Sequence, residues 1–274
     1  MIRKRLEGKA DSMQVAAPSP SLVRAADLLY DGVGHLLAAR EHLDVDYQPY
    51  ESSHDALNLL YHSIRHVEAV VELARKDLVM VSAAITTSRA ALESSLRALW
   101  LVDCDNPFER EGRWLGFMAE EVQSRTRAAK HLSSDGHTAL AAKNLQIAQQ
   151  LESHRQGVAR AMPEGFSQQP LPKFDALLTK TNTSISYAIY VVGSQYTHGT
   201  FWALSRFRQG LGTKRQFNEL KDNASWIVPL SVCESVIKDT GCRILNRLGA
   251  PHGRVLPRNY SAQLNRAIAD IKEA

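Results

Sequence analysis

Residues 78–103 read LVMVSAAITTSRAALESSLRALWLVD, a mainly apolar segment with the spacing of a long helix. Ala, Leu and Ser make up just over half of it, and Arg89, Glu93 and Arg97 recur in it every four residues. On a helix, these three side chains fall with Ser82 and Thr86 within about 80° of arc. We expect this helix and a helix over 184–206 to form the centre of a bundle, which would bring Arg89 and Glu93 near Ser194 and His198.

The charged stripe has two interpretations. It is either a strip that faces solvent, in which ion pairs four residues apart stabilise the helix slightly, or part of a cleft. In the second case Glu93 would hold Arg89, and the guanidinium would bind a phosphate or carboxylate group in bidentate fashion.

The rest of the chain also shows helical periodicity. Leu22, Leu29 and Leu36 recur at helical spacing after the Pro-Ser-Pro-Ser sequence that ends at Ser21, and Pro107 suits the first turn of another helix. No segment shows sustained alternation of apolar and polar residues, so we expect an all-α multi-helix bundle. The helices expected besides 78–103 are 21–42, 53–76, one that begins at 107, 135–161, 173–180, a segment over 184–207, 215–248 and 260–273.

The predicted organisation is a disordered or extended lead-in over 1–20 and one helical domain over 21–274. A subdivision is possible at 162–172, where Pro163, Pro170 and Pro172 interrupt the helical pattern. No run of about 18 apolar residues suggests a membrane span, and the basic N-terminus lacks the apolar core of a secretory signal. Three cysteines without paired spacing fit a reducing cytoplasm. We therefore expect a cytoplasmic protein that does not associate with a membrane.

Charge is distributed unevenly along the chain. The formal net charge is +4, but residues 1–80 carry 9 basic and 12 acidic side chains, whereas residues 161–274 carry 14 and 8. The basic C-terminal third could attract phosphate or an acidic protein partner. The alternative is an ordinary solvated helical surface.

Residues 181–205 contain no Asp, Glu, Lys or Arg, although 23% of the chain is charged. We therefore predict that this window is buried. It is rich in hydroxyl and amide side chains, which must find internal hydrogen-bond partners or line a cavity.

Within this window, Tyr190, Ser194 and His198 are spaced by four and would share one face of a helix. An imidazole is a good general acid or base, and Ser194 could orient His198 or serve as its nucleophilic partner. The alternative is a buried His198 that a hydroxyl satisfies. Gly193 and Gly199 weaken the helix prediction, and Gly199 could mark the close approach of a ligand or helix.

Metal and hydrolase signatures are absent from the sequence. His62 and His66 are four residues apart and could chelate zinc, but HExxH, DxDxDG, GxxxxGK[ST] and a GxGxxG after a strand do not occur. Residues 193–196, GSQY, do not form the GxSxG nucleophile elbow. We expect neither a metal nor a cofactor.

Residues 88–101, SRAALESSLRALWL, together with Tyr190 to Ser194 and His198-Gly199, resemble a group of uncharacterised all-helical bacterial proteins. These carry an Arg-x-x-x-Glu helix that ends in Trp-Leu and a later Tyr-Arg-x-x-Ser…His helix. That pattern is similar to the HEPN superfamily, whose members are helical and usually dimeric. Many of them are metal-independent ribonucleases in toxin, abortive-infection or other defence systems.

The resemblance implies a metal-independent endoribonuclease. His198 would be the general base for the ribose 2′-hydroxyl, with Ser194 beside it, and Arg89 would act on the phosphate with Glu93 holding it. Arg89 would then replace an arginine that the family's motif places before the histidine, because this chain has Val191 there. The remaining binding residues expected at this site are Tyr190, Tyr196 and Arg97.

The departure at Val191 also leaves a second function open. In this alternative the protein is a non-catalytic helical module that recognises a protein partner or nucleic acid through its basic C-terminal third. RNA, a protein partner and a second copy in a homodimer are therefore the expected partners.

Overall fold

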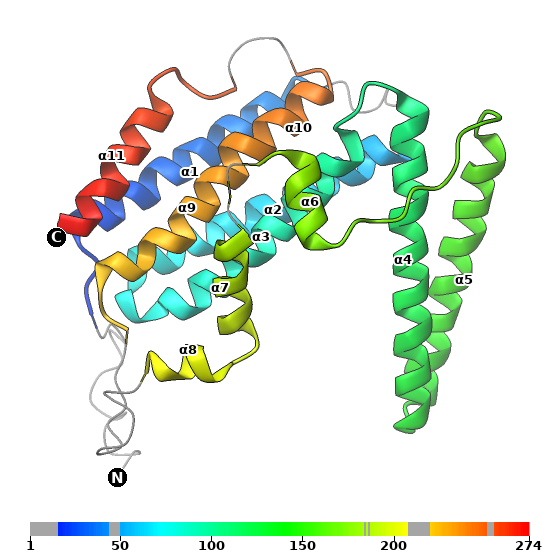
Figure 1. Cartoon of the computed structure of the whole chain (residues 1–274), viewed down its shortest axis with the longest axis horizontal. Helices are drawn as coiled ribbons and strands as arrows, with labels where there is room; N and C mark the ends of the chain where they lie inside the picture. Colours follow the sequence, from blue (N-terminus) through cyan, green and yellow to red (C-terminus); the bar gives the residue numbers. More distant parts are fainter. Residues whose placement is uncertain are drawn as a thin grey trace.

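The computed structural model describes residues 16–43, 50–183, 185, 187–207, 220–250 and 255–273. These residues form helices, turns and connecting segments, with no strand among them, and the predicted all-α bundle is confirmed. The main body of the bundle (Figure 1) is built from the following helices: α1 (Pro20–Glu41), α2 (Glu51–Lys76), α3 (Val81–Val102), α9 (Ile227–Ser235), α10 (Cys242–Arg247) and α11 (Tyr260–Glu273).

Helix α3 lies at the centre of this bundle, as its sequence predicts. It packs against α2, α9 and two further short helices, α6 (Phe174–Thr181) and α7 (Tyr187–Thr197). Leu92, Leu96 and Leu99 on α3 are at most 1% exposed. Burial of each such leucine removes apolar surface worth about 1.5–3 kcal/mol from water, so α3 supplies much of the core.

Two helices begin where sequence signals place them. The Ser19 hydroxyl accepts a hydrogen bond from the Leu22 amide at 3.3 Å, and Pro20 opens α1. The Asn106 side chain likewise accepts from the Phe108 amide at 2.9 Å, at the start of α4 (Pro107–Ser134). Each side chain satisfies a helix N–H that has no partner within the helix.

Helices α4 and α5 (Thr138–Ala161) form an antiparallel hairpin that projects from the bundle (Figure 1). Its packing is light, because Ala141 and Ala148 are the buried residues of α5. Leu140 and Leu145 on the same helix are about half exposed. The hairpin therefore depends mainly on helix propensity and side-chain pairs along its own surface.

The proline-rich segment 162–172 runs back along α4. The Gln169 amide donates to the Gly112 carbonyl at 2.8 Å. A Cβ atom at Gly116 would lie 1.7 Å from the Gln169 carbonyl oxygen, and one at Gly112 would lie 2.5 Å from that of Ser167. Glycine at these two positions is what lets the segment pack on the helix.

The C-terminal half departs from the expected long helix over 215–248. The helical part of it begins with a 3₁₀ turn over Asn223–Trp226, which Asp222 caps by accepting from the Ser225 amide at 2.7 Å. A π-helical segment, Val236–Gly241, then separates α9 from α10. The first part of that prediction, residues 215–219, lies outside the described residues, as do residues 1–15 of the expected lead-in.

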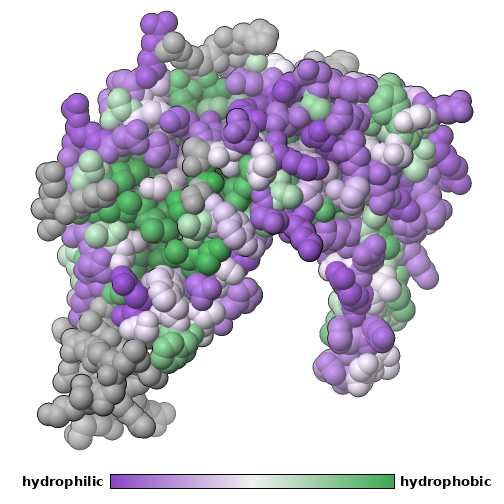
Figure 2. All heavy atoms as spheres, in the orientation of Figure 1, coloured by the Kyte–Doolittle hydropathy of each residue, from purple (hydrophilic) through white to green (hydrophobic). Residues whose placement is uncertain are grey.

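The charge-free window 181–205 is not buried as predicted. It forms the end of α6, then α7 and α8 (Phe201–Ser205), with Gly199 at φ 56° between the last two helices. Gly193 is the buried residue of α7, whereas Tyr187, Phe201 and Trp202 are 51%, 65% and 46% exposed. Because α7 contacts α3 on one side, its other side chains remain at the surface, and Figure 2 shows apolar residues gathered around α7 and α9.

No helix in the described part of the chain is long and apolar enough to cross a membrane.

Candidate functional site

Arg89 on α3 and Tyr190 on α7 meet across 101 residues of sequence. The Arg89 Nη2 donates to the Tyr190 hydroxyl at 3.0 Å and lies 2.8 Å from the Glu93 Oε1. The guanidinium carbon is 4.8 Å from the centre of the Tyr190 ring. With its side chain only 15% exposed, Arg89 faces α7 and not solvent, so the interpretation of the stripe as a solvent-facing strip is wrong for this pair.

Gly193 sets how closely α7 approaches α3. A Cβ atom at this position would lie 3.1 Å from the Arg89 Cβ and 3.3 Å from its Cδ. These contacts are tighter than ordinary van der Waals distances, so a larger residue would push Arg89 or the helix away. The glycine that weakened the helix prediction is thus the residue that lets α7 lie on Arg89.

Aromatic rings surround the Tyr190 side chain. The Phe174 ring, from α6, stacks on it with centroids 3.7 Å apart and an interplanar angle of 18°. The Tyr187 ring lies 5.7 Å away at 30°. Three helices that are separated in sequence therefore converge on one tyrosine and one arginine.

His198 lies at the opposite end of α7 from Tyr187, where its backbone amide donates to the Ser194 carbonyl at 3.0 Å. Its side chain is exposed and that of Ser194 is half-buried, so the alternative of a buried His198 is wrong. Within the described part of the chain, neither Arg89 nor Glu93 makes a hydrogen bond or ion pair with His198. The structure thus brings Arg89, Glu93 and Tyr190 together and places His198 on the surface beyond them.

The corner between α7 and α8 carries further aromatic groups next to His198 in the chain. The Tyr196 and Trp202 rings meet edge to face with centroids 5.9 Å apart. Burial raises the pKa of the Tyr196 phenol, against a smaller opposing effect of its neighbour Arg206. Phe201, beside Trp202, is the most exposed of the large apolar side chains described. The corner is an aromatic surface with a cation at its edge.

Two further candidates stand apart from this site. Arg97 is half-buried on α3 and, among the described residues, forms no hydrogen bond or ion pair with the Arg89 group. The His62 Nδ1 lies 3.1 Å from the Ser94 hydroxyl, and the His62 and His66 rings meet edge to face. Burial and the neighbouring His62 lower the pKa of His66. The described residues contain no group of three or more side chains suited to holding a metal.

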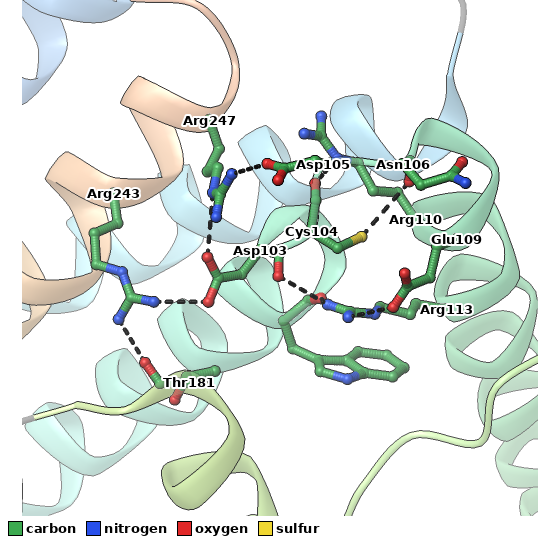
Figure 3. Close-up of polar contacts among 11 residues, drawn as sticks. Asp103, Cys104, Asp105, Asn106, Glu109, Arg110, Arg113, Thr181, Arg243 and Arg247 are labelled. Carbon is green, nitrogen blue, oxygen red and sulfur yellow. Dashed lines mark hydrogen bonds and ion pairs between the residues drawn. The ribbon is translucent and has the colours of Figure 1, made fainter.

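A second charged cluster, which the sequence reasoning missed, lies at the C-terminal end of α3 (Figure 3). Asp103 follows α3 directly, and its carboxylate accepts from Arg243 at 2.6 Å and from Arg247 at 3.2 Å. The available signals were Asp103 and Asp105 at a helix end and two arginines four residues apart. Nothing local in the sequence indicates that these groups, about 140 residues apart, would meet.

The fold and these contacts define an all-helical protein in which a half-buried arginine of the central helix, Arg89, contacts the helix that leads to His198. The model of the family DUF5677, a family of unknown function, matches residues 56–215. The match covers more than half of the chain, and the chain belongs to this family. It includes α3, α6 and α7 but not Arg243 and Arg247. No curated protein and no solved structure matched the chain.

Proposed function

We propose that this chain is a HEPN-like, metal-independent endoribonuclease of the toxin or phage-defence type, acting in the bacterial cytoplasm with His198 as its general base. The observation that supports this best is the contact between Arg89 and Tyr190, because it fixes a cation of α3 against the helix that leads to His198. A ribonuclease of this kind needs a base and a cation near one RNA phosphate, since RNA carries its own nucleophile.

The chemistry assigned to His198 is transfer of the 2′-hydroxyl proton to its imidazole. The 2′-oxygen then attacks phosphorus, and the bond from phosphorus to the 5′-oxygen breaks. The leaving oxygen takes a proton, and the products are a 2′,3′-cyclic phosphate and a 5′-hydroxyl. The exposed position of His198 suits this role, because a general base must come within hydrogen-bond distance of a polymeric substrate.

Arg89 is assigned the phosphate, and this role requires α7 to shift when RNA binds, because Arg89 contacts Tyr190, about 12 Å along the chain's helical rise from His198. The Arg89 Nη2 serves Glu93 and Tyr190, while its Nε is buried without a hydrogen-bond partner. A guanidinium has five donors in a planar fork that matches phosphate oxygens. Glu93 and Tyr190 orient this fork, and Ser194 lies in the last turn of α7, just before His198 in the following turn.

The exposed aromatic side chains of α7 and α8 support single-stranded RNA as the substrate. Phe201 and Trp202 are well exposed, and Tyr187 lies half exposed at the start of α7. Unpaired bases stack on such rings at about 1–3 kcal/mol per base. A homodimer, which the HEPN resemblance also implies, would then form through another face of the bundle.

The experiment is cleavage of a labelled single-stranded RNA by the wild-type protein and by His198→Ala, with and without chelator. We expect cleavage that chelator does not affect and a loss of at least about 100-fold in His198→Ala, in line with the contribution of a general base. His131→Ala, which changes an exposed histidine of α4, is the matched control and should retain activity. The proposal fails if wild-type protein leaves the RNA intact or if His198→Ala cleaves equally well.

Val191, which replaces the expected arginine, favours a second candidate: a protein that binds nucleic acid or a protein partner without cleaving it. This candidate would bind through the basic C-terminal third of the chain. The net positive charge there is lowered, because Arg243 and Arg247 pair with Asp103 and Asp105. In this case RNA affinity should fall steeply with salt, because phosphate contacts release counterions, and the RNA should be recovered intact. A salt-independent affinity would exclude the nucleic-acid form of this candidate.

A further inference from the structure

A small cavity is lined by side chains of α7, α9, the π-helical segment Val236–Gly241 and α11. Its volume is about 230 Å³, below the range of about 300–1,000 Å³ that is usual for drug-sized ligands. Ile189 of α7 and Ile185 just before this helix form an apolar wall. The rest of the lining is polar: Ser231, Glu234, Ser235, Lys238, Asp239 and Asn265. A ligand of this cavity must therefore be small and partly apolar.

The Glu234 carboxylate has no counter-ion in this lining. The residue is half-buried, and within the described part of the chain its side chain forms no hydrogen bond or ion pair. Its oxygens are not among the side-chain atoms that are sealed from solvent, so a ligand in the cavity can reach them. Burial raises the pKa of the Glu234 carboxyl, with a smaller opposing effect from Lys238 and a further increase from Asp239. Burial without a counter-ion destabilises the charged carboxylate, and a bound cation would relieve this cost.

The other charged groups of the lining leave one negative charge in excess. The Asp239 Oδ2 accepts from the Ser235 hydroxyl at 2.8 Å. Lys238 is exposed, so salt and water screen its ammonium group. In the lining itself, the two carboxylates of Glu234 and Asp239 face the single ammonium group of Lys238. The charge of the cavity therefore suits a ligand with one positive charge.

The π-helical segment supplies Lys238 and Asp239 to this cavity. A Cβ atom at Gly241, the last residue of the segment, would lie 3.1 Å from the Val236 carbonyl oxygen and 2.9 Å from the Leu36 Cδ1. Glycine is therefore what lets this wider turn pack against α1. Short π-helical segments within α-helices are frequent at functional sites, and this one lies beside the unpaired carboxylate.

We propose that this cavity binds a short primary alkylammonium ion, with Glu234 as its counter-ion. An ammonium group has three donors, and the lining offers the Glu234 carboxylate, the Ser231 hydroxyl and the Asn265 amide oxygen as acceptors. The hydrocarbon part of the ligand packs against the two isoleucines. The inference does not depend on the ribonuclease proposal, because the residues that carry it include neither Arg89 nor His198.

The test is a titration of the full-length protein with n-butylammonium chloride at pH 8 and constant ionic strength, followed by the amide signals in NMR. We expect saturable shifts that potassium chloride does not reproduce. n-Butanol, which has nearly the same shape without the charge, should bind at least about tenfold more weakly, because hydrogen bonds between charged groups are the stronger ones.

Glu234→Gln keeps the shape of the side chain and removes its charge. It should weaken the affinity for n-butylammonium at least about tenfold. Its melting temperature should equal or exceed that of the wild type, because a half-buried charge without a counter-ion is removed. Glu120→Gln, which changes an exposed carboxylate of α4, is the matched control and should bind as the wild type does.

Three results would overturn the proposal. The first is the absence of saturable shifts with the wild-type protein. The second is equal affinity for n-butanol, which would show an apolar cavity without a cation site. The third is unchanged affinity in Glu234→Gln, which would place the ammonium group elsewhere. His198→Ala must leave the affinity for n-butylammonium unchanged, and this separates the amine site from the ribonuclease proposal.

Discussion

Two regions of α3 are joined to their neighbours by different forces. In its middle, Arg89 lies under Tyr190 and beside Gly193, with its side chain 15% exposed. At its end, Asp103 is 15% exposed but its partners Arg243 and Arg247 are 36% and 38% exposed. The middle is a packed contact that contains one ion pair, and the end is a network of ion pairs that reaches solvent.

The two regions therefore allow the effect of close packing on stability to be measured separately from the effect of ion pairs. Charges near solvent are screened by salt over about 10 Å at 0.1 M, whereas close packing is insensitive to ionic strength. The middle of α3 should therefore depend on the size of the residue at 193, and the end should depend on the carboxylate at 103. The two regions also differ in their relation to the family match, since α6 and α7 lie within residues 56–215 and Arg243 and Arg247 lie outside them.

The largest expected effect comes from Asp103→Ala. It leaves Arg243 and Arg247 without their shared carboxylate, and the two guanidinium groups then repel each other. We expect the free energy of unfolding to fall by about 2–3 kcal/mol, less than for a fully buried pair because both arginines reach solvent. Urea denaturation at low salt measures this loss.

Asp105→Ala is the matched control for that change. Its side chain is 94% exposed and, among the described residues, pairs with Arg247, so we expect a loss below about 0.5 kcal/mol. In 1 M salt the cost of Asp103→Ala should shrink while the control stays near zero. Equal costs for the two substitutions, or a cost for Asp103→Ala that salt leaves unchanged, would contradict a charge-based contact at the end of α3.

A smaller effect is expected from Gly193→Val in the middle of the helix. The new side chain would press on the Arg89 Cβ and Cδ, and overpacking of this kind costs about 1–2 kcal/mol. The loss should be the same at low and high salt. Gly157→Val on α5 is the control, because nothing lies within 4 Å of a Cβ there, and it should leave stability unchanged or slightly raised. A neutral Gly193→Val would show that α7 can move off α3 freely.

The helices were predictable because their signals are local. The spacing of Leu22, Leu29 and Leu36, the Pro107 start and the narrow stripe on residues 78–103 depend on neighbours within one or two turns. The same reasoning could not say what the stripe would face, since Arg89 meets a tyrosine 101 residues away. The direction of a helix face is set by tertiary packing.

The candidate site was predicted in part for the same reason. Spacing placed Tyr190, Ser194 and His198 on one helix; Tyr190 and Ser194 do lie on α7, but the helix ends at Thr197 and His198 lies in the turn that follows. The absence of charge over 181–205 was misleading, because aromatic and hydroxyl side chains such as Tyr187 can stay at a surface without charge. The pairing of Asp103 with Arg243 left no signal, since it arises when α10 packs beside α3.

The smallest expected effect comes from Tyr190→Phe, which tests a single contact in the middle of α3. The substitution removes the acceptor of the Arg89 hydrogen bond but retains the ring that stacks on Phe174. Because Arg89 keeps its ion pair with Glu93, we expect a loss of about 1 kcal/mol by urea denaturation. Tyr190→Ala also deletes the stacked ring of this half-buried side chain and should cost about 2 kcal/mol, more than Tyr190→Phe but less than removal of a fully buried ring. If Tyr190→Phe instead costs as much as Tyr190→Ala, the hydroxyl and its charged donor hold α7 in place, and the middle of α3 is then a charge-based contact like its end.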